Sequence, residues 1–209
     1  TKMIGGTVGE DVWAMTFHSA CCRILRREIE RLGYSSSFTI YDTTDSERVI
    51  KEILKEFNLD DKIFVPRKVL GAISKAKDKQ QGAAEFRKDV GDDYRLRRIA
   101  DIYEEYAKRL KASNAVDFDD IILLTVQLLQ NFEDVRRYYQ RKFRYVLIDE
   151  YQDTNHLQYL LASLLAGGHE NICVVGDDDQ SIYRFRGATI RNILDFENEY
   201  HGAKVIRLE

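Results

Sequence analysis

The feature that most constrains the fold is a set of short apolar runs in the last third of the chain. The runs cover residues 145–148, 172–175 and 204–208, and residues 156–166 and 188–199 between them repeat apolar side chains at helical spacing. This order predicts a β-α-β-α-β unit. Because the runs are apolar throughout rather than alternating, we expect a parallel sheet that is covered by helices on both faces.

Both central strands of this predicted sheet end in acidic residues. Asp149 and Glu150 follow the first strand, and Gly176 and Asp177 follow the second. Ligands of parallel α/β sheets bind beyond the carboxyl ends of the strands, so these acids are expected to meet at one edge. Two adjacent carboxylates there can divide phosphate chemistry, one holding Mg²⁺ and the other positioning or deprotonating a water molecule. Acids that end a strand can also simply face solvent or cap the next helix.

The loop after the second strand, GDDDQSIYRFRGA, combines acids, an amide and alternating rings and arginines. Single-stranded nucleic acid is bound by rings that stack on bases and by guanidinium groups that contact phosphates. The aromatic and basic side chains of this loop are Tyr183, Arg184, Phe185 and Arg186. Gln180 lies between them and the acids, where its amide can bind a phosphate or a water molecule. Ordinary packing, with arginine side chains reaching solvent, is the alternative interpretation.

Residues 20–116 carry a different pattern, with apolar side chains at three- and four-residue steps that predict amphipathic helices. Glycines interrupt the charged stretch 75–93, where we expect a loop or frayed helix ends. This region holds 21 Lys and Arg against 17 Asp and Glu, whereas its flanks hold 11 against 18. So small a basic excess can face phosphates, but it is also typical of a solvated helical surface. We therefore expect a helical insertion into an α/β domain, with residues 12–17 as a further strand and Asp117 capping a buried helix.

Length and composition limit the class of protein. At 209 residues with 44% apolar side chains, the chain can bury a sizeable core. The longest stretch without charge, residues 121–132, is too short to cross a bilayer. Cys21, Cys22 and Cys173 show no disulfide or zinc spacing, and no signal-peptide pattern begins the chain. We expect a cytoplasmic protein without a membrane partner.

Several segments resemble motifs of the UvrD/PcrA/Rep family of superfamily-one DNA helicases. VLIDEYQDTN, residues 146–155, is similar to motif II, the Walker B element, and GDDDQSIYRFRGA is similar to motif III. TFHS, residues 16–19, resembles motif Ib, and VDFDDII, residues 116–122, also resembles sequences of this family. These motifs are long and specific, and the resemblance covers essentially the whole chain.

The resemblance implies roles for individual residues. Asp149 is expected to coordinate the Mg²⁺ that is bound to ATP, and Glu150 to act as the general base that activates the hydrolytic water. Gln180 is expected to sense the γ-phosphate and to couple it to DNA. The residues expected to contact single-stranded DNA are Thr16, His18, Ser19, Tyr183, Phe185 and Arg186. Phe185 stands where many relatives have tryptophan.

The resemblance also implies a domain organisation. Residues 1–19 and 117–209 correspond to part of the RecA-like ATPase domain, 1A, and residues 20–116 correspond to the helical subdomain 1B. The expected fold class is α/β: a partial RecA-like parallel sheet with flanking helices, which carries an all-helical insertion subdomain. The whole helicase is expected to use ATP for 3′–5′ translocation on single-stranded DNA and for unwinding at junctions of single and double strands, in DNA repair or replication.

The sequence has no P-loop. The pattern G-x-x-x-x-G-K-[ST] cradles the phosphates of ATP, and this chain contains no Gly-Lys pair. We therefore expect a fragment of a longer helicase that is inactive alone. Two other classes stay open: a nucleic-acid-binding module without enzymatic activity, and a Mg²⁺-dependent nuclease or phosphotransfer domain that uses Asp149, Glu150 and Asp177.

Overall fold

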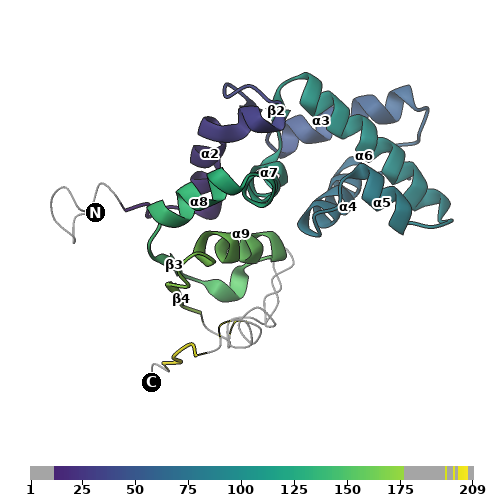
Figure 1. Cartoon of the computed structure of the whole chain (residues 1–209). Helices are drawn as coiled ribbons and strands as arrows, with labels where there is room; N and C mark the ends of the chain where they lie inside the picture. Colours follow the sequence, from purple (N-terminus) through teal and green to yellow (C-terminus); the bar gives the residue numbers. More distant parts are fainter. Residues whose placement is uncertain (1–11, 177–195, 197–199, 201, 207–209) are drawn as a thin grey trace. The chain divides into compact units, whose positions relative to one another are not determined.

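The computed structural model describes residues 12–176, 196, 200 and 202–206. The chain divides into two compact units: unit 1 is Thr1–Lys77 with Gln81–Thr125, and unit 2 is Asp78–Gln80 with Val126–Glu209. In chain order the elements (Figure 1) are α2 (Phe17–Glu28), the 3₁₀ helix η1 (Ile29–Leu32), β1 (Thr39–Ile40), α3 (Thr43–Glu56), α4 (Pro66–Asp78), α5 (Ala83–Asp89), α6 (Tyr94–Ala112), β2 (Ala115–Val116), α7 (Phe118–Asn131), α8 (Glu133–Lys142), β3 (Val146–Ile148), the 3₁₀ helix η2 (Tyr151–Asp153), α9 (His156–Ala166) and β4 (Ile172–Val174). Over the described residues, none of these helices has the length and hydrophobicity that crossing a membrane requires.

Helices α3, α4 and α6 surround the apolar core of unit 1. On α6 the buried side chains fall at steps of three and four residues, which places them along one face of the helix. Pro66 occupies the first position of α4, where a missing N–H costs no hydrogen bond. The carboxylate of Asp42 and the backbone of Asp45 form a reciprocal capping box that begins α3. The predicted helical character of residues 20–116 is confirmed for these elements.

A short parallel ladder joins two distant parts of unit 1. Thr39 pairs with Ala115 and Ile40 with Val116, and the N–H of Tyr41 donates to the carbonyl of Val116 at 2.8 Å. Strand β1 leads into α3 and strand β2 leads into α7, so both helices begin at the same end of the ladder. Residues 20–116 are therefore not all-helical: they contain this ladder, whose strands are too short to give a periodic signal in the sequence.

Two local predictions for unit 1 are wrong. Residues 12–16 form no strand, because the hydroxyl of Thr16 accepts a hydrogen bond from the N–H of Ser19 and the chain enters α2 at Phe17. In the stretch 75–93, where a loop or frayed helix ends were expected, residues 83–89 form the helix α5. This helix is held by packing on α6, where the ring of Phe86 meets that of Tyr103 edge-on at 6.2 Å.

Unit 2 contains the predicted parallel β-α-β arrangement. Strands β3 and β4 pair in parallel, with Val146 opposite Ile172 and Ile148 opposite Val174, and α9 connects them (Figure 1). Asn155 and Gln158 form the capping box that begins α9. The α/β fold class with flanking helices is confirmed.

The described residues cover only one face of the β3–β4 sheet. Ile148 is buried, whereas Leu147 is 75% exposed and its partner Cys173 is also exposed. Side chains alternate between the faces of a strand, so Leu147 and Cys173 share the uncovered face. The predicted coverage of both faces is thus wrong for the described part of the chain. Residues 203–206 form no strand, and most of the predicted helix 188–199 lies outside the described residues.

Candidate active site and nucleic-acid interface

The acidic pair lies at the carboxyl end of β3, beside the end of β4. The N–H of Val175 donates to the carbonyl of Ile148 at 2.8 Å, and the N–H of Tyr151 donates to the carbonyl of Val175 at 2.9 Å. These two hydrogen bonds hold the turn formed by Asp149 and Glu150 against the last residues before the second loop. The ends of the two strands therefore lie together at one edge of the sheet, as the β-α-β pattern predicts.

Glu150 has an uncommon backbone conformation. Its φ of 51° and ψ of 43° lie in the left-handed region, which costs a non-glycine residue about 1–3 kcal/mol. Its N–H donates to Oδ1 of Asp149 at 2.9 Å, and Nε2 of the buried Gln152 donates to its Oε2 at 2.6 Å. The hydrogen bond from Gln152 thus holds the Glu150 carboxylate, while the one to Asp149 holds its backbone. Residues in strained conformations of this kind are concentrated at active sites and switch regions.

The oxygen atoms of this pair suit a hard cation and a water molecule. Asp149 and Glu150 are both exposed. The described residues contain no cluster of three or more His, Cys, Asp or Glu side chains that can hold a metal. Mg²⁺ is commonly held by one or two carboxylates, with water and substrate phosphates completing the octahedron. The chemistry of the pair therefore fits Mg²⁺ that is delivered with a nucleotide.

The residues predicted in the second loop cannot be placed beside this pair. Asp177, Gln180, Tyr183, Phe185 and Arg186 all lie outside the described residues. Their roles stay predictions. The described chain reaches Gly176, which directly follows the Val175 that contacts the acidic turn.

The TFHS residues lie at the start of α2 in unit 1, whereas the acidic pair belongs to unit 2. Thr16 and Ser19 are exposed, and their hydroxyl oxygens are 3.0 Å apart. The ring of His18 packs against that of Phe118, with ring centres 4.9 Å apart. The first turn of a helix presents unpaired N–H groups, so exposed hydroxyls there are well placed to contact phosphate oxygens.

A buried charge cluster in unit 1 was not predicted from the sequence. Lys77 is 3% exposed, and its Nζ lies 2.6 Å from Oδ2 of Asp117 and 2.7 Å from Oδ1 of Asp120. The hydroxyl of Tyr106 donates to the same oxygen of Asp117 at 2.9 Å. Asp117 and Asp120 also bind each other's backbone N–H, forming a capping box that begins α7. Two acids three residues apart at a helix start were the only signal in the sequence.

The cluster shifts the titration of its members because one cation faces two carboxylates. Burial acts to lower the pKa of Lys77, but Asp120 and Asp117 outweigh it and raise that pKa well above its usual value. Burial acts to raise the pKa of Asp117, but Lys77 and the hydrogen bonds of the carboxylate lower it. Burial, opposed by Lys77 and reinforced by Asp117, raises the pKa of Asp120 to about 6. Asp120 is therefore the member that binds a proton most readily on acidification.

The raised pKa of Asp120 predicts a measurable dependence of stability on pH. The folded-state pKa of Asp120 lies above its ordinary value of 3.8. Its contribution to the free energy of unfolding is therefore fully present below about pH 4 and is lost as the pH rises through about 6. At about 1.4 kcal/mol per pKa unit, the loss reaches at most about 3 kcal/mol. Urea denaturation should show that the unmutated chain loses this free energy of unfolding between pH 4 and 8, whereas Asp120→Asn does not. Asp61→Asn, at an exposed acid, is the control. The same dependence of the free energy of unfolding on pH in the unmutated chain and in both variants would refute the prediction.

Comparison with known proteins gives a consistent result. A family model described as the UvrD/REP helicase N-terminal domain matches residues 1–201. The chain is 51% identical over 208 residues to the ATP-dependent DNA helicase PcrA of Bacillus subtilis, and 48% identical to PcrA of Staphylococcus aureus. PcrA of Staphylococcus epidermidis is 47% identical over 205 residues. These alignments cover 97–100% of this chain, which spans only 28% of the length of each relative.

Proposed function

The chain belongs to the UvrD/REP helicase family, and we propose that it forms part of the ATP-driven motor of a DNA helicase. In this proposal residues 1–19 and 117–209 form part of the RecA-like domain 1A, and residues 20–116 form the subdomain 1B. The observation that carries the proposal is the turn Asp149–Glu150 at the shared edge of β3 and β4. It occupies the position at which parallel α/β sheets bind their ligands.

The residues of the acidic turn divide the hydrolytic work. Asp149 holds Mg²⁺, which supplies charge neutralisation of the ATP phosphates when it is bound. Glu150 accepts the proton of the attacking water, and Gln152 keeps its carboxylate in place through the hydrogen bond to Oε2. Gln180 senses the γ-phosphate and couples it to DNA. Since this chain contains no Gly-Lys pair, the phosphate cradle is contributed by the rest of the helicase.

Two segments contact DNA in this proposal: residues 16–19 at the start of α2, and the loop that follows β4. Thr16, His18 and Ser19 contact the backbone of single-stranded DNA from the start of α2. Tyr183, Phe185 and Arg186 stack on bases and contact phosphates. The whole helicase then translocates 3′–5′ on single-stranded DNA, acts at junctions with duplex DNA in the cytoplasm, and serves DNA repair or replication.

The isolated chain is expected to bind single-stranded DNA but not to hydrolyse ATP. Binding by Lys and Arg weakens steeply as salt rises, so fluorescence anisotropy should show an affinity that falls between low and moderate salt. A steady-state phosphate-release assay with Mg²⁺ and single-stranded DNA should show no turnover above the protein-free rate. Robust turnover that Glu150→Gln abolishes would refute the proposed inactivity. DNA cleavage by the chain with Mn²⁺ would favour a nuclease instead.

A further inference from the structure

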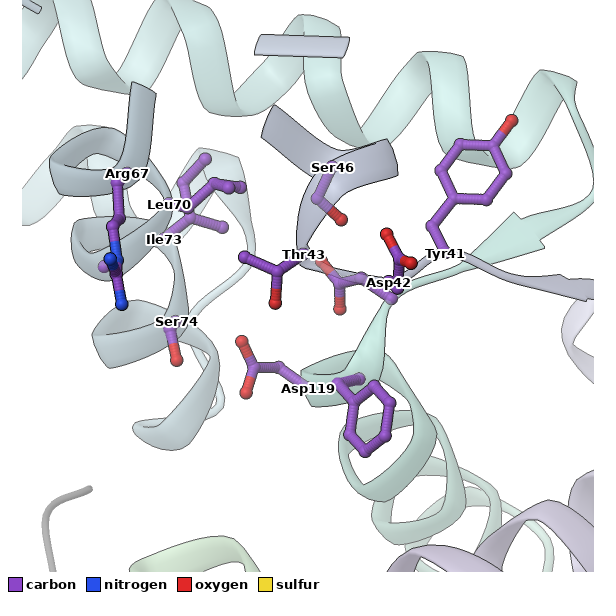
Figure 2. A pocket seen from close by; sticks show the side chains of 12 residues that line it. Tyr41, Asp42, Thr43, Ser46, Arg67, Leu70, Ile73, Ser74 and Asp119 are labelled. Carbon is purple, nitrogen blue, oxygen red and sulfur yellow. The ribbon is translucent and has the colours of Figure 1, made fainter. Parts of the chain in front are cut away.

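A small cavity in unit 1, lined by both polar and apolar side chains, lies where the starts of α3 and α7 meet one side of α4. Its volume is about 200 Å³. Figure 2 shows Asp42, Thr43 and Ser46 at the start of α3, Arg67 and Ser74 on α4, and the carboxylate of Asp119 pointing between Thr43 and Ser74. The β1–β2 ladder builds this cavity, because it brings the first turns of α3 and α7 together from distant parts of the sequence. The backbone that positions these side chains is therefore fixed by hydrogen bonds.

The acids of the cavity differ in their hydrogen-bond and ion-pair partners. Asp42 caps α3, and Asp117 binds Lys77 and Tyr106. Asp119 has Ser74 as its side-chain hydrogen-bond partner, while burial, followed by the charge of Asp117, raises the pKa of the Asp119 carboxyl. A carboxylate can accept several hydrogen bonds, so Asp119 can take a further donor that reaches into the cavity beside Ser74. Arg67 lines the same cavity and is exposed, so its guanidinium can meet an acceptor.

The charges of the cavity decide which ligand chemistry it can take. The charge of Asp117 is paired with Lys77, and the carboxylates of Asp42 and Asp119 still outnumber the single cation Arg67, so a phosphate group is repelled. A divalent cation would find few free ligands there, because Asp42 caps α3 and Asp117 is bound to Lys77 and Tyr106. A neutral planar group that offers an amine donor on one edge and a carbonyl acceptor on another suits Asp119 and Arg67 together. Leu70 and Ile73 supply apolar contact for its faces.

An exposed ring links this cavity to the predicted DNA contacts. Phe118 lines the cavity and is 51% exposed, and its ring packs on that of His18. His18 and Asp119 also interact electrostatically. A strand whose phosphates contact Thr16, His18 and Ser19 thus passes an aromatic ring at the mouth of the cavity. Unstacked bases are commonly received by such a ring and read along their hydrogen-bonding edge.

Building on the proposed single-stranded DNA binding, we infer that this cavity receives one nucleobase and favours cytosine, which carries both an exocyclic amine and a carbonyl oxygen, over thymine. The ring of Phe118 stacks on the base, the Asp119 carboxylate accepts a hydrogen bond from the amine, and Arg67 donates to a carbonyl oxygen of the base. Cytosine offers an N4 amine and an O2 acceptor, whereas thymine has no amine. Asp119 is therefore a specificity-determining residue that acts on the base and not on the backbone.

The test compares homopolymeric deoxycytidine and deoxythymidine strands of equal length. Their affinities for the whole chain are measured by fluorescence anisotropy, with EDTA present to exclude cation binding. Asp119→Ala should weaken binding of the cytosine strand roughly tenfold while leaving the thymine strand within about twofold. Asp119→Asn keeps the shape of the side chain, and its affinity for the cytosine strand should lie between those of the unmutated chain and Asp119→Ala. Phe118→Leu should weaken both strands equally, since stacking does not depend on the amine.

The outcomes separate this inference from the proposed function. Asp61→Asn, an exposed acid outside the cavity, should leave both affinities unchanged. If the chain binds DNA with the expected salt dependence but Asp119 variants alter both strands alike, or neither, the nucleobase cavity is refuted while DNA binding stands. If the folded chain binds neither strand at any salt concentration, both proposals fail. Thermal denaturation by circular dichroism verifies that each variant is folded.

Discussion

Replacing Glu150 by glutamine is expected to reduce ATP turnover about 10²–10⁴-fold in a helicase that carries this chain. The appropriate protein is PcrA of Bacillus subtilis in which the matching segment, 51% identical, is exchanged for these residues. Glutamine keeps the size of the side chain and its contact with Gln152, but it cannot accept a proton from water. The measurement is steady-state phosphate release with saturating single-stranded DNA. The affinity for a fluorescent ATP analogue should change by less than about threefold, since binding of the phosphates does not require the general base Glu150.

Asp153→Asn is the matched control for this substitution. Asp153 is an exposed acid on η2, in the same segment as Glu150, and lies outside the turn that contacts Val175. Its replacement should leave turnover within about twofold. An equal loss in both variants would indicate general damage to the segment. Full turnover in Glu150→Gln would exclude the assigned role of general base.

Replacing Lys77 by methionine is expected to destabilise unit 1 by about 3–5 kcal/mol. Methionine has a similar length but no charge, so the carboxylates of Asp117 and Asp120 are left buried without their cation. The loss is a large share of the roughly 5–15 kcal/mol by which domains are stable. Urea denaturation followed by circular dichroism at pH 8, where both acids are ionised in the unfolded chain, measures the change in the free energy of unfolding.

Lys75→Met distinguishes burial from loss of charge. Lys75 lies on the same helix but is exposed, and its replacement should change stability by less than about 0.5 kcal/mol. In Lys77→Met, converting Asp117 and Asp120 to asparagine should restore part of the lost stability, because no buried charge remains. A loss below about 1 kcal/mol in Lys77→Met would contradict the structural role of the cluster.

The sequence predicts the parallel β-α-β arrangement and the position of Asp149 and Glu150, because both depend on local signals. Runs of apolar residues identify β3 and β4, and parallel topology alone places the acids at one edge. The helix predicted at residues 156–166 is likewise confirmed as α9, although its capping box of Asn155 and Gln158 was not predicted. The family assignment rests on motifs in the same region and is confirmed by the family match.

Features that depend on distant residues could not be predicted in this way. Lys77 lies in an amphipathic helix where a lysine is normally solvated, and only the tertiary approach of Asp117 and Asp120 explains its burial. The β1–β2 ladder consists of strands too short for any periodic pattern, yet it builds the cavity around Asp119. The exposure of Leu147 could not be predicted either, because a continuous apolar run indicates an apolar environment but not which segment provides it.

Phosphate release by the unmutated chimeric PcrA is the most direct measurement of whether this chain supplies the hydrolytic edge of a DNA-dependent motor. We predict ATP hydrolysis that requires Mg²⁺ and rises when single-stranded DNA is added, with Bacillus subtilis PcrA as the reference. A chimera that folds and binds both ATP and single-stranded DNA, yet hydrolyses no ATP above background, would contradict the assignment of Asp149 and Glu150.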